Sequence, residues 1–210
     1  MRVAVVGAAG RTGRHVVEQA LAKGNDVIAV ARDAKAITKR HDNLRIRSCD
    51  VRDRVSLVEA TKDVDAIVSA LGTGSSRAPT DVYSAGVQSE LEAMRRNGID
   101  KLVVISAAPV GPRGEQSLLD RRIAMPLLER FFGALYDDMR RMEAILEQST
   151  LGWVALRPPR LVDKPGTGKY RIDTSPLPKA RTLTYSDLAA ALLDSLERDD
   201  LNRRAAYVAN

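Results

Sequence analysis

The chain begins with a short apolar segment that runs directly into a glycine-rich turn. Residues 2–6 are typical of a buried β-strand, residues 7–13 read GAAGRTG, and a helical pattern follows from Arg14. A strand, a glycine turn and a helix in this order form the unit that binds the pyrophosphate of a dinucleotide. This segment therefore favours an α/β fold and predicts a nucleotide cofactor before any other residue is considered.

Each glycine of this turn has its own expected role. Gly7 permits the tight turn as the chain leaves the strand, Gly10 lets the backbone approach the phosphates, and Gly13 lets the helix pack against the sheet. The helix N-terminus then offers the anion its free N–H groups and the positive end of its dipole. The spacing differs from the commoner Gly-x-Gly-x-x-Gly, so the prediction depends on the flanking strand and helix. The alternative is a purely structural turn.

A second position indicates which dinucleotide is bound. The next apolar strand ends at Arg32, nineteen positions after Gly13. A carboxylate in this region would bind the ribose hydroxyls of NAD, whereas a guanidinium can pair with the 2′-phosphate of NADP and stack on adenine. NADP(H) is therefore favoured over NAD(H). Asp33 leaves the opposite assignment open, because its carboxylate could take the ribose-binding role.

Apolar runs rich in Val and Ile alternate with amphipathic helical segments along the rest of the chain. This alternation predicts one Rossmann-type α/β domain, residues 1–210, with a doubly wound, mostly parallel sheet of about six to seven strands flanked by helices. A length of 210 residues, 44% of them hydrophobic, is enough to bury one core. The expected strands are 2–6, 27–31, 44–48, 66–70, 102–106, 153–157 and 206–208.

Composition bounds the partners and the compartment. The net charge is +6, but basic residues are scattered as doublets and aromatic residues are 4% of the chain, so a nucleic-acid partner is not expected. The chain has a single cysteine, Cys49, which excludes an internal disulfide. It shows neither a signal peptide nor an apolar stretch long enough to span a membrane, so a cytoplasmic protein is expected. His15 and His41 lack partners at ligand spacing, so no metal is expected. Monomer and dimer both remain open.

The active site of a doubly wound sheet lies outside the carboxyl ends of its strands. In this chain those ends carry short polar, glycine-containing or proline-containing motifs. The candidate residues are Asp50, Val51, Leu71, Gly72, Ser106, Pro158 and Pro159. Residues 157–185, which are rich in glycine and proline, are expected to contribute to the substrate cleft. The segment around Leu118 and Leu119 is expected to form a wall or lid.

These motifs together resemble those of the atypical short-chain dehydrogenase/reductase superfamily. The resemblance covers nearly the whole chain and is strongest to the small NAD(P)H-binding and NmrA-like group, which includes the biliverdin reductase B-like flavin reductases. The motifs that carry it are GAAGRTG at 7–13, VAR at 30–32, CDV at 49–51, ALGTG at 70–74, ISA at 105–107, LRPPRL at 156–161 and PGTGKY at 165–170. They are much less specific for a substrate than for the superfamily.

The resemblance implies a role for each strand-end residue in binding the cofactor. The pyrophosphate would be held by Gly7, Gly10, Arg11, Thr12 and Gly13. Arg32 would hold the 2′-phosphate, and Asp50 and Val51 would meet the adenine. The nicotinamide side would be flanked by Leu71, Gly72 and Ser106, and its carboxamide pocket shaped by Pro158 and Pro159.

The superfamily's usual proton donor is the tyrosine of a Tyr-x-x-x-Lys pair. This chain offers Tyr136 with Arg140 four residues later, but the family pattern of this helix, counted back from Ser149, places the lysine position at Met139. One residue rotates a side chain by about 100° around a helix, and arginine stays protonated where lysine can titrate. Ser106 and Tyr136 are therefore the candidate catalytic residues, with the role of Tyr136 open.

The leading function is an NADPH-dependent oxidoreductase that transfers hydride to a planar small molecule, such as a flavin, a quinone or a biliverdin-like acceptor. Such an acceptor can take its proton from water, so the missing pair does not exclude reduction. One alternative is an NmrA-like redox sensor that binds NADP(H) without turnover. Another is a nucleotide-sugar epimerase or dehydratase, which the missing Tyr/Lys pair and the short C-terminal part disfavour.

Overall fold

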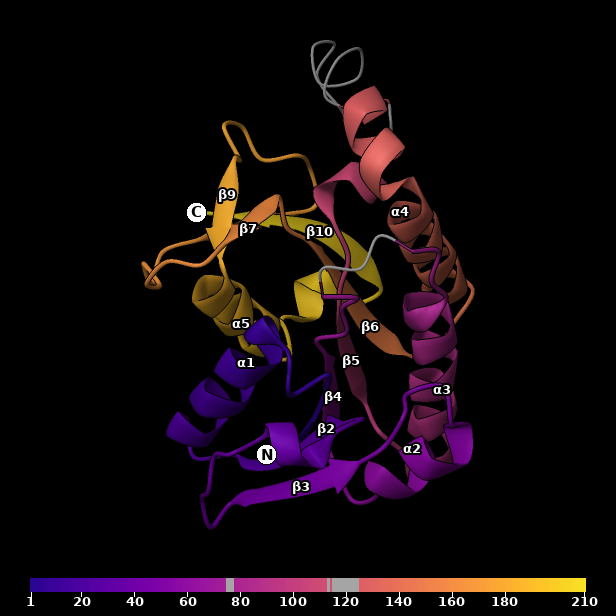
Figure 1. Ribbon diagram of the computed structural model, residues 1–210, viewed down its shortest axis with the longest axis vertical. Helices are drawn as coiled ribbons and strands as arrows, with labels where there is room; N and C mark the ends of the chain where they lie inside the picture. Colours follow the sequence, from indigo (N-terminus) through magenta and orange to yellow (C-terminus); the bar gives the residue numbers. More distant parts are fainter. Residues whose placement is uncertain (75–77, 113, 115–124) are drawn as a thin grey trace.

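The computed structural model describes residues 1–74, 78–112, 114 and 125–210. Within these residues, eight strands form a central sheet in the order β3-β2-β1-β4-β5-β6-β10-β8 (Figure 1). Every pairing is parallel except that of β8 with β10. The strands are β1 Arg2–Val6, β2 Asp26–Ala31, β3 Leu44–Ser48, β4 Ala66–Ser69, β5 Lys101–Ile105, β6 Gly152–Arg157, β8 Arg171–Asp173 and β10 Arg204–Ala209.

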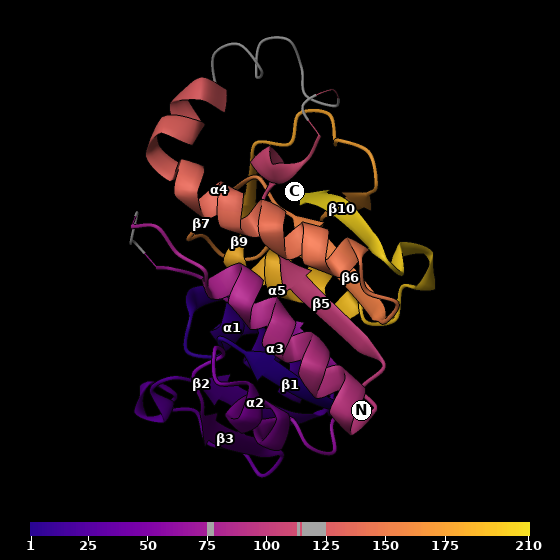
Figure 2. The same ribbon diagram turned by 90° about the vertical axis from the view of Figure 1, so that its right-hand side faces the viewer.

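Helices cover both faces of this sheet, as expected for a doubly wound fold. The helices α1 (Arg11–Ala22) and α5 (Tyr185–Asp194) pack together on one face. The other face carries α2 (Arg54–Ala60), α3 (Val82–Asn97) and α4 (Met125–Glu147), and Figure 2 shows α3 and α4 side by side across the sheet. Short 3-10 helices are η1 (Ala34–Ala36), η2 (Ala108–Val110) and η5 (Asp199–Leu201).

The core lies in two layers, one on each side of the sheet. Along β1, Val3 and Val5 belong to the layer under α1 and α5, whereas Ala4 and Val6 belong to the layer under α2, α3 and α4. This division follows from the alternation of side chains along a strand. It also explains why β1 is apolar from Val3 to Val6, since both of its faces are covered there.

The predicted α/β fold with a doubly wound, mostly parallel sheet is confirmed, and the C-terminal region adds strands beyond the expected six to seven. Within 157–185, β8 joins the edge of the main sheet, and β7 (Arg160–Val162) and β9 (Thr182–Thr184) form a small parallel sheet. Three-residue strands are too short to show a period in the sequence, so this region read as an irregular excursion. The expected lid around Leu118 and Leu119 lies outside the described residues.

Candidate functional site

The strand order reverses direction between β1 and β4, and the crevice of a doubly wound sheet opens at such a point. The turns after these two strands touch. A Cβ added to Gly7 would lie 2.6 Å from the Ala70 carbonyl oxygen and 3.1 Å from the Leu71 amide nitrogen. The glycine turn and the loop containing Leu71 and Gly72 therefore form one continuous floor.

The glycine turn has the geometry that its sequence predicts. Gly7 has a φ of +81°, in the left-handed region that favours glycine. The Gly10 amide donates a hydrogen bond of 3.0 Å to the Gly7 carbonyl oxygen. A Cβ on Gly13 would lie only 2.3 Å from that same oxygen. The turn therefore closes tightly, and α1 starts directly against it.

The N-terminus of α1 is open toward this turn. Its N-cap is Gly10, no side chain in the described part of the chain caps it, and no acidic residue lies in its first turn. By contrast, side-chain oxygens of Asp53 and Thr184 cap α2 and α5. An uncapped helix N-terminus keeps N–H donors and a partial positive charge available for an anion. Thr12, which is buried, lies in this first turn with Gly13.

Arg11 is held beside this N-terminus by an aromatic ring. Its guanidinium carbon lies 4.5 Å from the centroid of the Tyr185 ring, at the start of α5. A cation–π contact of this kind restrains the side chain while its charge stays available. Sequence reasoning missed Tyr185, because nothing in the local pattern connects two residues so far apart along the chain.

The end of β2 presents an arginine and an aspartate in different situations. One Oδ of Asp33 accepts a hydrogen bond of 2.9 Å from the Lys35 amide, so this carboxylate caps η1. Arg32 is exposed, and among the described residues no ion pair engages its guanidinium. The Arg32 guanidinium is therefore available to a ligand here, whereas one oxygen of Asp33 is already engaged.

The ends of β3 and β4 meet through apolar packing. Val51 is buried, and Asp50 next to it accepts a hydrogen bond of 3.0 Å from the Arg52 amide. A Cβ on Gly86 would lie 2.6 Å from a Leu71 methyl carbon and 3.3 Å from a Val51 methyl carbon. Leu71 and Val51 therefore pack over α3 at this position and form one apolar wall.

Ser106 is a buried polar group at the end of β5. Its side chain is 2% exposed, and its Oγ has no hydrogen-bond partner among the described residues. Buried polar groups are nearly always satisfied, so an unpaired hydroxyl indicates a missing ligand or water. The Ser106 amide donates to the Leu156 carbonyl oxygen at 2.7 Å, and the Ala108 amide to that of Pro158 at 2.8 Å. These bonds place the loop that contains Pro158 and Pro159, called the proline loop below, beside Ser106.

Tyr136 does not have the surroundings of the usual tyrosine–lysine pair. Its ring lies 6.2 Å from the Phe132 ring, and burial raises the pKa of its phenol. Met139, at the expected lysine position, is buried in the core. Arg140 pairs with Asp137 at 2.8 Å. A lysine would lower the pKa of this phenol, and here burial outweighs the lowering effect of the Arg140 charge.

Comparison with known proteins assigns the family. The sequence profile of the NAD(P)H-binding family matches residues 7–199. The chain belongs to this family. An uncharacterised chloroplast protein of Arabidopsis thaliana is 29% identical to it over 176 residues. The match covers 80% of this chain but 61% of the Arabidopsis protein, so the chain spans less than two thirds of that relative's length.

Solved structures confirm the fold of this NAD(P)H-binding protein. The oxidoreductase ylbE of Lactococcus lactis superposes with a TM-score of 0.81 at 16% identity, over 100% of this chain and 91% of that one. A Streptococcus pneumoniae protein, proposed to be an NADH-flavin reductase, gives 0.79 at 20% identity, over 100% and 99%. Such low identities establish the Rossmann fold alone. The family match confirms the resemblance to the NAD(P)H-binding group of the superfamily.

The geometry of the site fits a nicotinamide dinucleotide. The open N-terminus of α1 suits a pyrophosphate. So does the glycine turn, whose backbone lies too close to Gly13 to admit a side chain there. The unpaired Ser106 hydroxyl suits a polar group at the other end of the crevice. Among the described residues, no cluster of His, Cys, Asp or Glu could hold a metal ion. None of the helices among the described residues is long and apolar enough to cross a membrane.

A buried ion pair behind the proline loop was not predicted from the sequence. Arg157, the last residue of β6, donates to both oxygens of Glu143 on α4, at 3.0 and 2.6 Å. Its guanidinium carbon also lies 5.4 Å from the centroid of the Tyr207 ring. The pair ties α4 to the sheet next to Pro158. It connects residues from different elements, so no sequence spacing indicates it.

A second buried carboxylate, that of Asp187, connects segments of the C-terminal part of the chain. Asp187 on α5 accepts hydrogen bonds from the amides of Thr167 and Gly168 and from the side chain of Asn210. Burial opposes ionisation, but these donors lower the pKa of Asp187 to about 2. The glycine-rich motif at 165–170 is thereby fixed against α5 and the end of β10.

Proposed function

We propose that this protein is an NADPH-dependent oxidoreductase that transfers hydride to a planar acceptor such as a flavin, a quinone or a biliverdin-like molecule. The observation that carries the proposal is the buried, unpaired Ser106 hydroxyl beside the proline loop. A polar group is available there to orient a carboxamide or an acceptor, while apolar and proline residues restrict water. NADPH, when bound, supplies the hydride.

In this proposal the protein binds and orients rather than performing acid–base chemistry. The backbone of Gly7 to Gly13 and the Arg11 charge hold the pyrophosphate, Asp50 and Val51 hold the adenine, and Leu71 and Gly72 support the nicotinamide ribose side. Ser106 donates a hydrogen bond to the carboxamide or the acceptor, and Pro158 and Pro159 shape the carboxamide pocket. Rate acceleration then comes mainly from proximity and orientation.

The preference for NADP(H) depends on Arg32. Its guanidinium is exposed without a carboxylate partner among the described residues, whereas Asp33 caps η1. A charge-assisted hydrogen bond to the 2′-phosphate contributes about 1.5–3 kcal/mol, or roughly ten- to a hundredfold in affinity. Arg32→Glu should therefore weaken NADPH binding by about this factor and NADH binding much less. Fluorescence titration measures both affinities.

A charge-matched control is Lys62→Glu, at an exposed position after α2. It should leave both affinities within about twofold of the wild type. It makes the same change of charge as Arg32→Glu, but at a position away from the strand ends. Equal losses of NADPH and NADH binding in Arg32→Glu would contradict the preference for NADP(H).

The acceptor class is tested by following the NADPH absorbance band with FMN, riboflavin, biliverdin and a set of quinones, with NADH in parallel. We expect acceptor-dependent loss of NADPH with at least one planar acceptor. Ser106→Ala should lower turnover by at least tenfold with a smaller change in NADPH affinity, because its hydroxyl acts at the reacting end. Tight NADPH binding without turnover of any acceptor would overturn the oxidoreductase proposal.

A second candidate is a redox sensor that binds NADP(H) and reports its oxidation state to a protein partner. The buried Tyr136 with a raised pKa, and Met139 at the expected lysine position, favour this candidate because they leave the superfamily's proton donor incomplete. It requires a difference of at least tenfold between the affinities for NADPH and NADP⁺, measured by calorimetry, together with the absence of turnover.

A further inference from the structure

The strand β3 and the segment before it carry an unusual share of the positive charge. Residues 32–47 contain six Lys or Arg and two Asp, a net charge of +4 within a chain whose total is +6. Among the described residues, none of these six cations makes an ion pair with a carboxylate. Arg32 is assigned to the cofactor, which leaves five cations without a proposed role.

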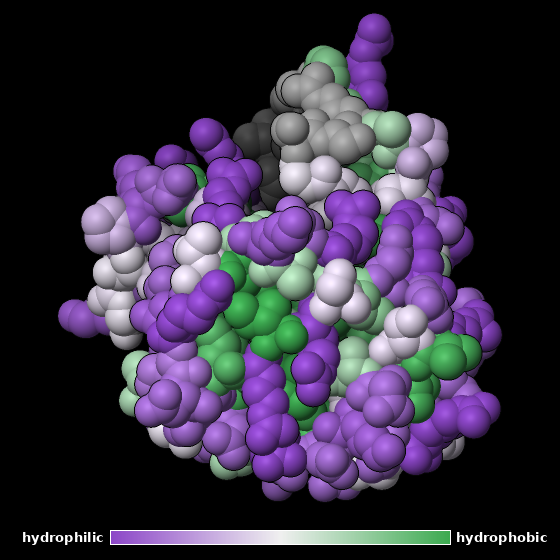
Figure 3. Space-filling view, turned by 60° about the horizontal axis from the view of Figure 1, so that its bottom comes forward, coloured by the Kyte–Doolittle hydropathy of each residue, from purple (hydrophilic) through white to green (hydrophobic). Residues whose placement is uncertain are grey.

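A cavity of about 360 Å³ lies among these cations. Its floor is apolar and formed by Ile37, Leu44 and Ile46, which pack against the core layer under α1. Its other lining residues are Ala34, Lys35, Lys39, Arg40 and His41. Figure 3, which brings the bottom of Figure 1 forward, shows an apolar area on this side of the molecule, bordered and crossed by hydrophilic side chains.

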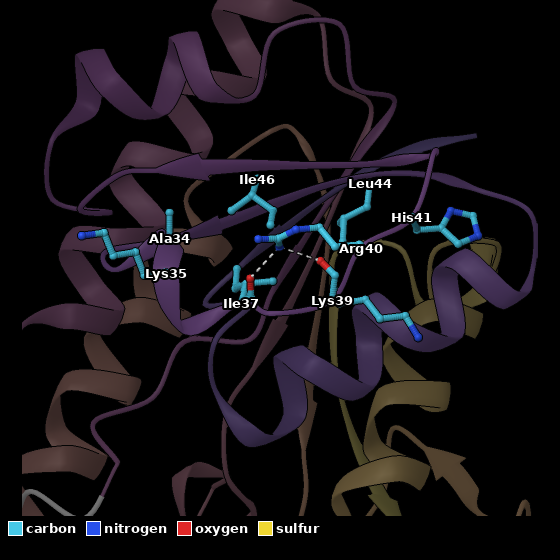
Figure 4. Close-up of a pocket in the computed structure, with 8 residues that line it drawn as sticks. All are labelled: Ala34, Lys35, Ile37, Lys39, Arg40, His41, Leu44 and Ile46. Carbon is cyan, nitrogen blue, oxygen red and sulfur yellow. Dashed lines mark hydrogen bonds between the residues drawn. The ribbon is translucent and has the colours of Figure 1, made fainter.

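Arg40 lies across this cavity, between Ile37 and Ile46 (Figure 4). Its Nη1 donates to the carbonyl oxygens of Ile37 and Lys39, at 3.3 and 3.1 Å. Backbone carbonyls thus position the guanidinium over the apolar floor without neutralising its charge. Lys35 and Lys39 point away from the cavity toward its surroundings in the same view.

The cavity extends away from the cofactor crevice. The chain leaves β2 at its carboxyl end, next to Arg32, and enters β3 at Leu44, which lies beside Val27 near the amino end of β2. Lys39, Arg40 and His41 come shortly before Leu44, the first residue of β3. The glycine turn lies at the opposite, carboxyl ends of the strands. A dinucleotide in the crevice therefore does not account for the cations toward this end, Lys39, Arg40 and Arg45.

β3 is also an edge strand. Among the described strands it is the last on its side of the sheet, and β2 is its one partner. Leu44 and Ile46 lie on the cavity side, and Arg45 and Arg47, which alternate with them, are exposed. An edge strand offers backbone N–H and C=O groups to a further strand, and such addition is a common mode of peptide recognition.

We propose that the β3 edge is a docking surface for an extended acidic segment of a partner protein, which adds to the sheet as a strand. Its alternate apolar side chains enter the cavity over Ile37, Leu44 and Ile46. Its acidic side chains lie on the opposite face, beside Arg45 and Arg47. The recognised pattern is therefore an alternation of apolar and acidic residues, because side chains alternate along a strand.

Charge and composition favour this occupant over two others. A second copy of this chain paired through β3 would bring the arginines of both copies together, and like charges across a strand pair are destabilising. A single-stranded nucleic acid is bound through aromatic stacking as well as charge. The cavity lining contains no aromatic ring other than the imidazole of His41.

The test uses fluorescence anisotropy with a labelled synthetic peptide in which valine alternates with glutamate. One control peptide has the same composition with valine and glutamate in separate blocks, and another alternates valine with lysine. We expect saturable binding of the alternating acidic peptide and at least tenfold weaker binding of both controls. In an isotope-labelled sample, the backbone amides of Leu44 and Ile46 should shift with the peptide.

Two protein variants test the surface itself. Arg45→Glu/Arg47→Glu should weaken peptide binding at least tenfold and leave NADPH binding unchanged. The matched control Lys179→Glu/Arg181→Glu reverses two exposed charges in the segment before β9 and should change peptide binding by less than twofold. Ile46→Thr keeps a β-branched residue in the strand and removes apolar surface from the cavity. It should weaken peptide binding without changing any charge.

Several outcomes would overturn the proposal. Equal binding of the block peptide would show that the peptide is bound by non-specific charge attraction. Equal loss of peptide binding in the two double variants would show that the β3 edge is not the binding surface. Dimerisation in sedimentation experiments that Arg45→Glu/Arg47→Glu abolishes would assign the edge to a second copy. Displacement of the peptide by a single-stranded oligonucleotide at comparable concentration would assign it to nucleic acid.

Discussion

The two ends of the crevice are built in different ways. At the cofactor end, Gly7, Gly10 and Gly13 shape the turn within a stretch of seven residues, and the Gly7 and Ala8 amides donate to the Val30 carbonyl oxygen of β2. At the acceptor end, Ser106 lies beside a loop from β6 that is supported from behind by α4 and β10. The glycine turn at the first end comes mainly from one short stretch of sequence, whereas the second end is assembled from distant segments.

Under the proposed function, this difference separates binding of the cofactor from choice of the acceptor. A local turn that one strand and one helix define can be conserved as a unit while the surrounding chain changes. An end that depends on α4 and on residues 157–185 changes whenever those elements shift relative to the sheet. Cofactor class is therefore readable from a short motif, whereas the acceptor depends on tertiary packing.

The largest expected effect comes from Gly13→Ala at the cofactor end. The new Cβ would lie 2.3 Å from the Gly7 carbonyl oxygen and 2.8 Å from the Ala8 Cα. Backbone must move, so we expect a loss of about 3 kcal/mol or more in the free energy of unfolding and at least a hundredfold loss of NADPH affinity. Denaturant unfolding and fluorescence titration measure the two quantities.

Gly133→Ala is the matched control for this prediction. A Cβ at Gly133 on α4 meets none of the described residues within 4 Å, so the same substitution should stabilise the helix by up to about 1 kcal/mol. NADPH affinity should not change. A Gly13→Ala protein with normal NADPH affinity would show that the close approach is not needed for binding, and the contrast between the two ends would be lost.

The same contrast explains what could be predicted from the sequence. The bounds of β1 and β3 and the glycine turn follow from short apolar patterns and from backbone requirements, which neighbouring residues determine. The contact of Arg11 with Tyr185 and the pairing of Arg157 with Glu143 were not predictable, because each joins residues from different elements. Ser106 was predicted by its place at a strand end, but its lack of a partner emerges only from the packing around it.

Glu143→Ala tests the acceptor end and should have the second largest effect. It would leave the Arg157 guanidinium buried without its carboxylate, which costs about 3–5 kcal/mol in the free energy of unfolding. The double variant Arg157→Met/Glu143→Met should recover most of this loss, because no charge then remains buried. Chemical denaturation of the single and double variants measures the difference.

The same variants separate the two ends functionally. In the double variant we expect the KM for the acceptor to change by at least threefold, with NADPH affinity within twofold of the wild type. Arg157 immediately precedes Pro158, so a shift of β6 moves the acceptor end first. Equal changes in both parameters would show that the two ends do not behave independently.

Glu90 on α3 gives a smaller effect that depends on pH. It is fully buried, neither of its carboxylate oxygens makes a well-formed hydrogen bond to the described residues, and burial raises its pKa to about 8, with the Ser69 hydroxyl partly offsetting this. The folded state then keeps a proton that the unfolded state, with a pKa near 4.5, releases. The free energy of unfolding should therefore fall as pH rises from about 4.5 to 8, by up to about 1.4 kcal/mol per unit.

Glu90→Gln tests this assignment, because the amide does not titrate. Its free energy of unfolding should vary less with pH between 5 and 8 than that of the wild type, in denaturant titrations at constant ionic strength. Identical pH dependence in both proteins would place the titration elsewhere. Because Glu90 is buried on α3 beside Ser69, the last residue of β4, NADPH affinity should be measured over the same pH range.

The smallest effect is expected for Tyr136→Phe, and it decides how the acceptor end works. The phenol is buried and its pKa is raised, and Met139 fills the position where a lysine would lower it. If the acceptor takes its proton from water, removal of the hydroxyl should change kcat by less than threefold and leave its pH profile unaltered. A tenfold loss of kcat, with loss of the basic limb of the profile, would make Tyr136 the proton donor. The acceptor end would then perform acid–base chemistry despite lacking the superfamily's usual lysine.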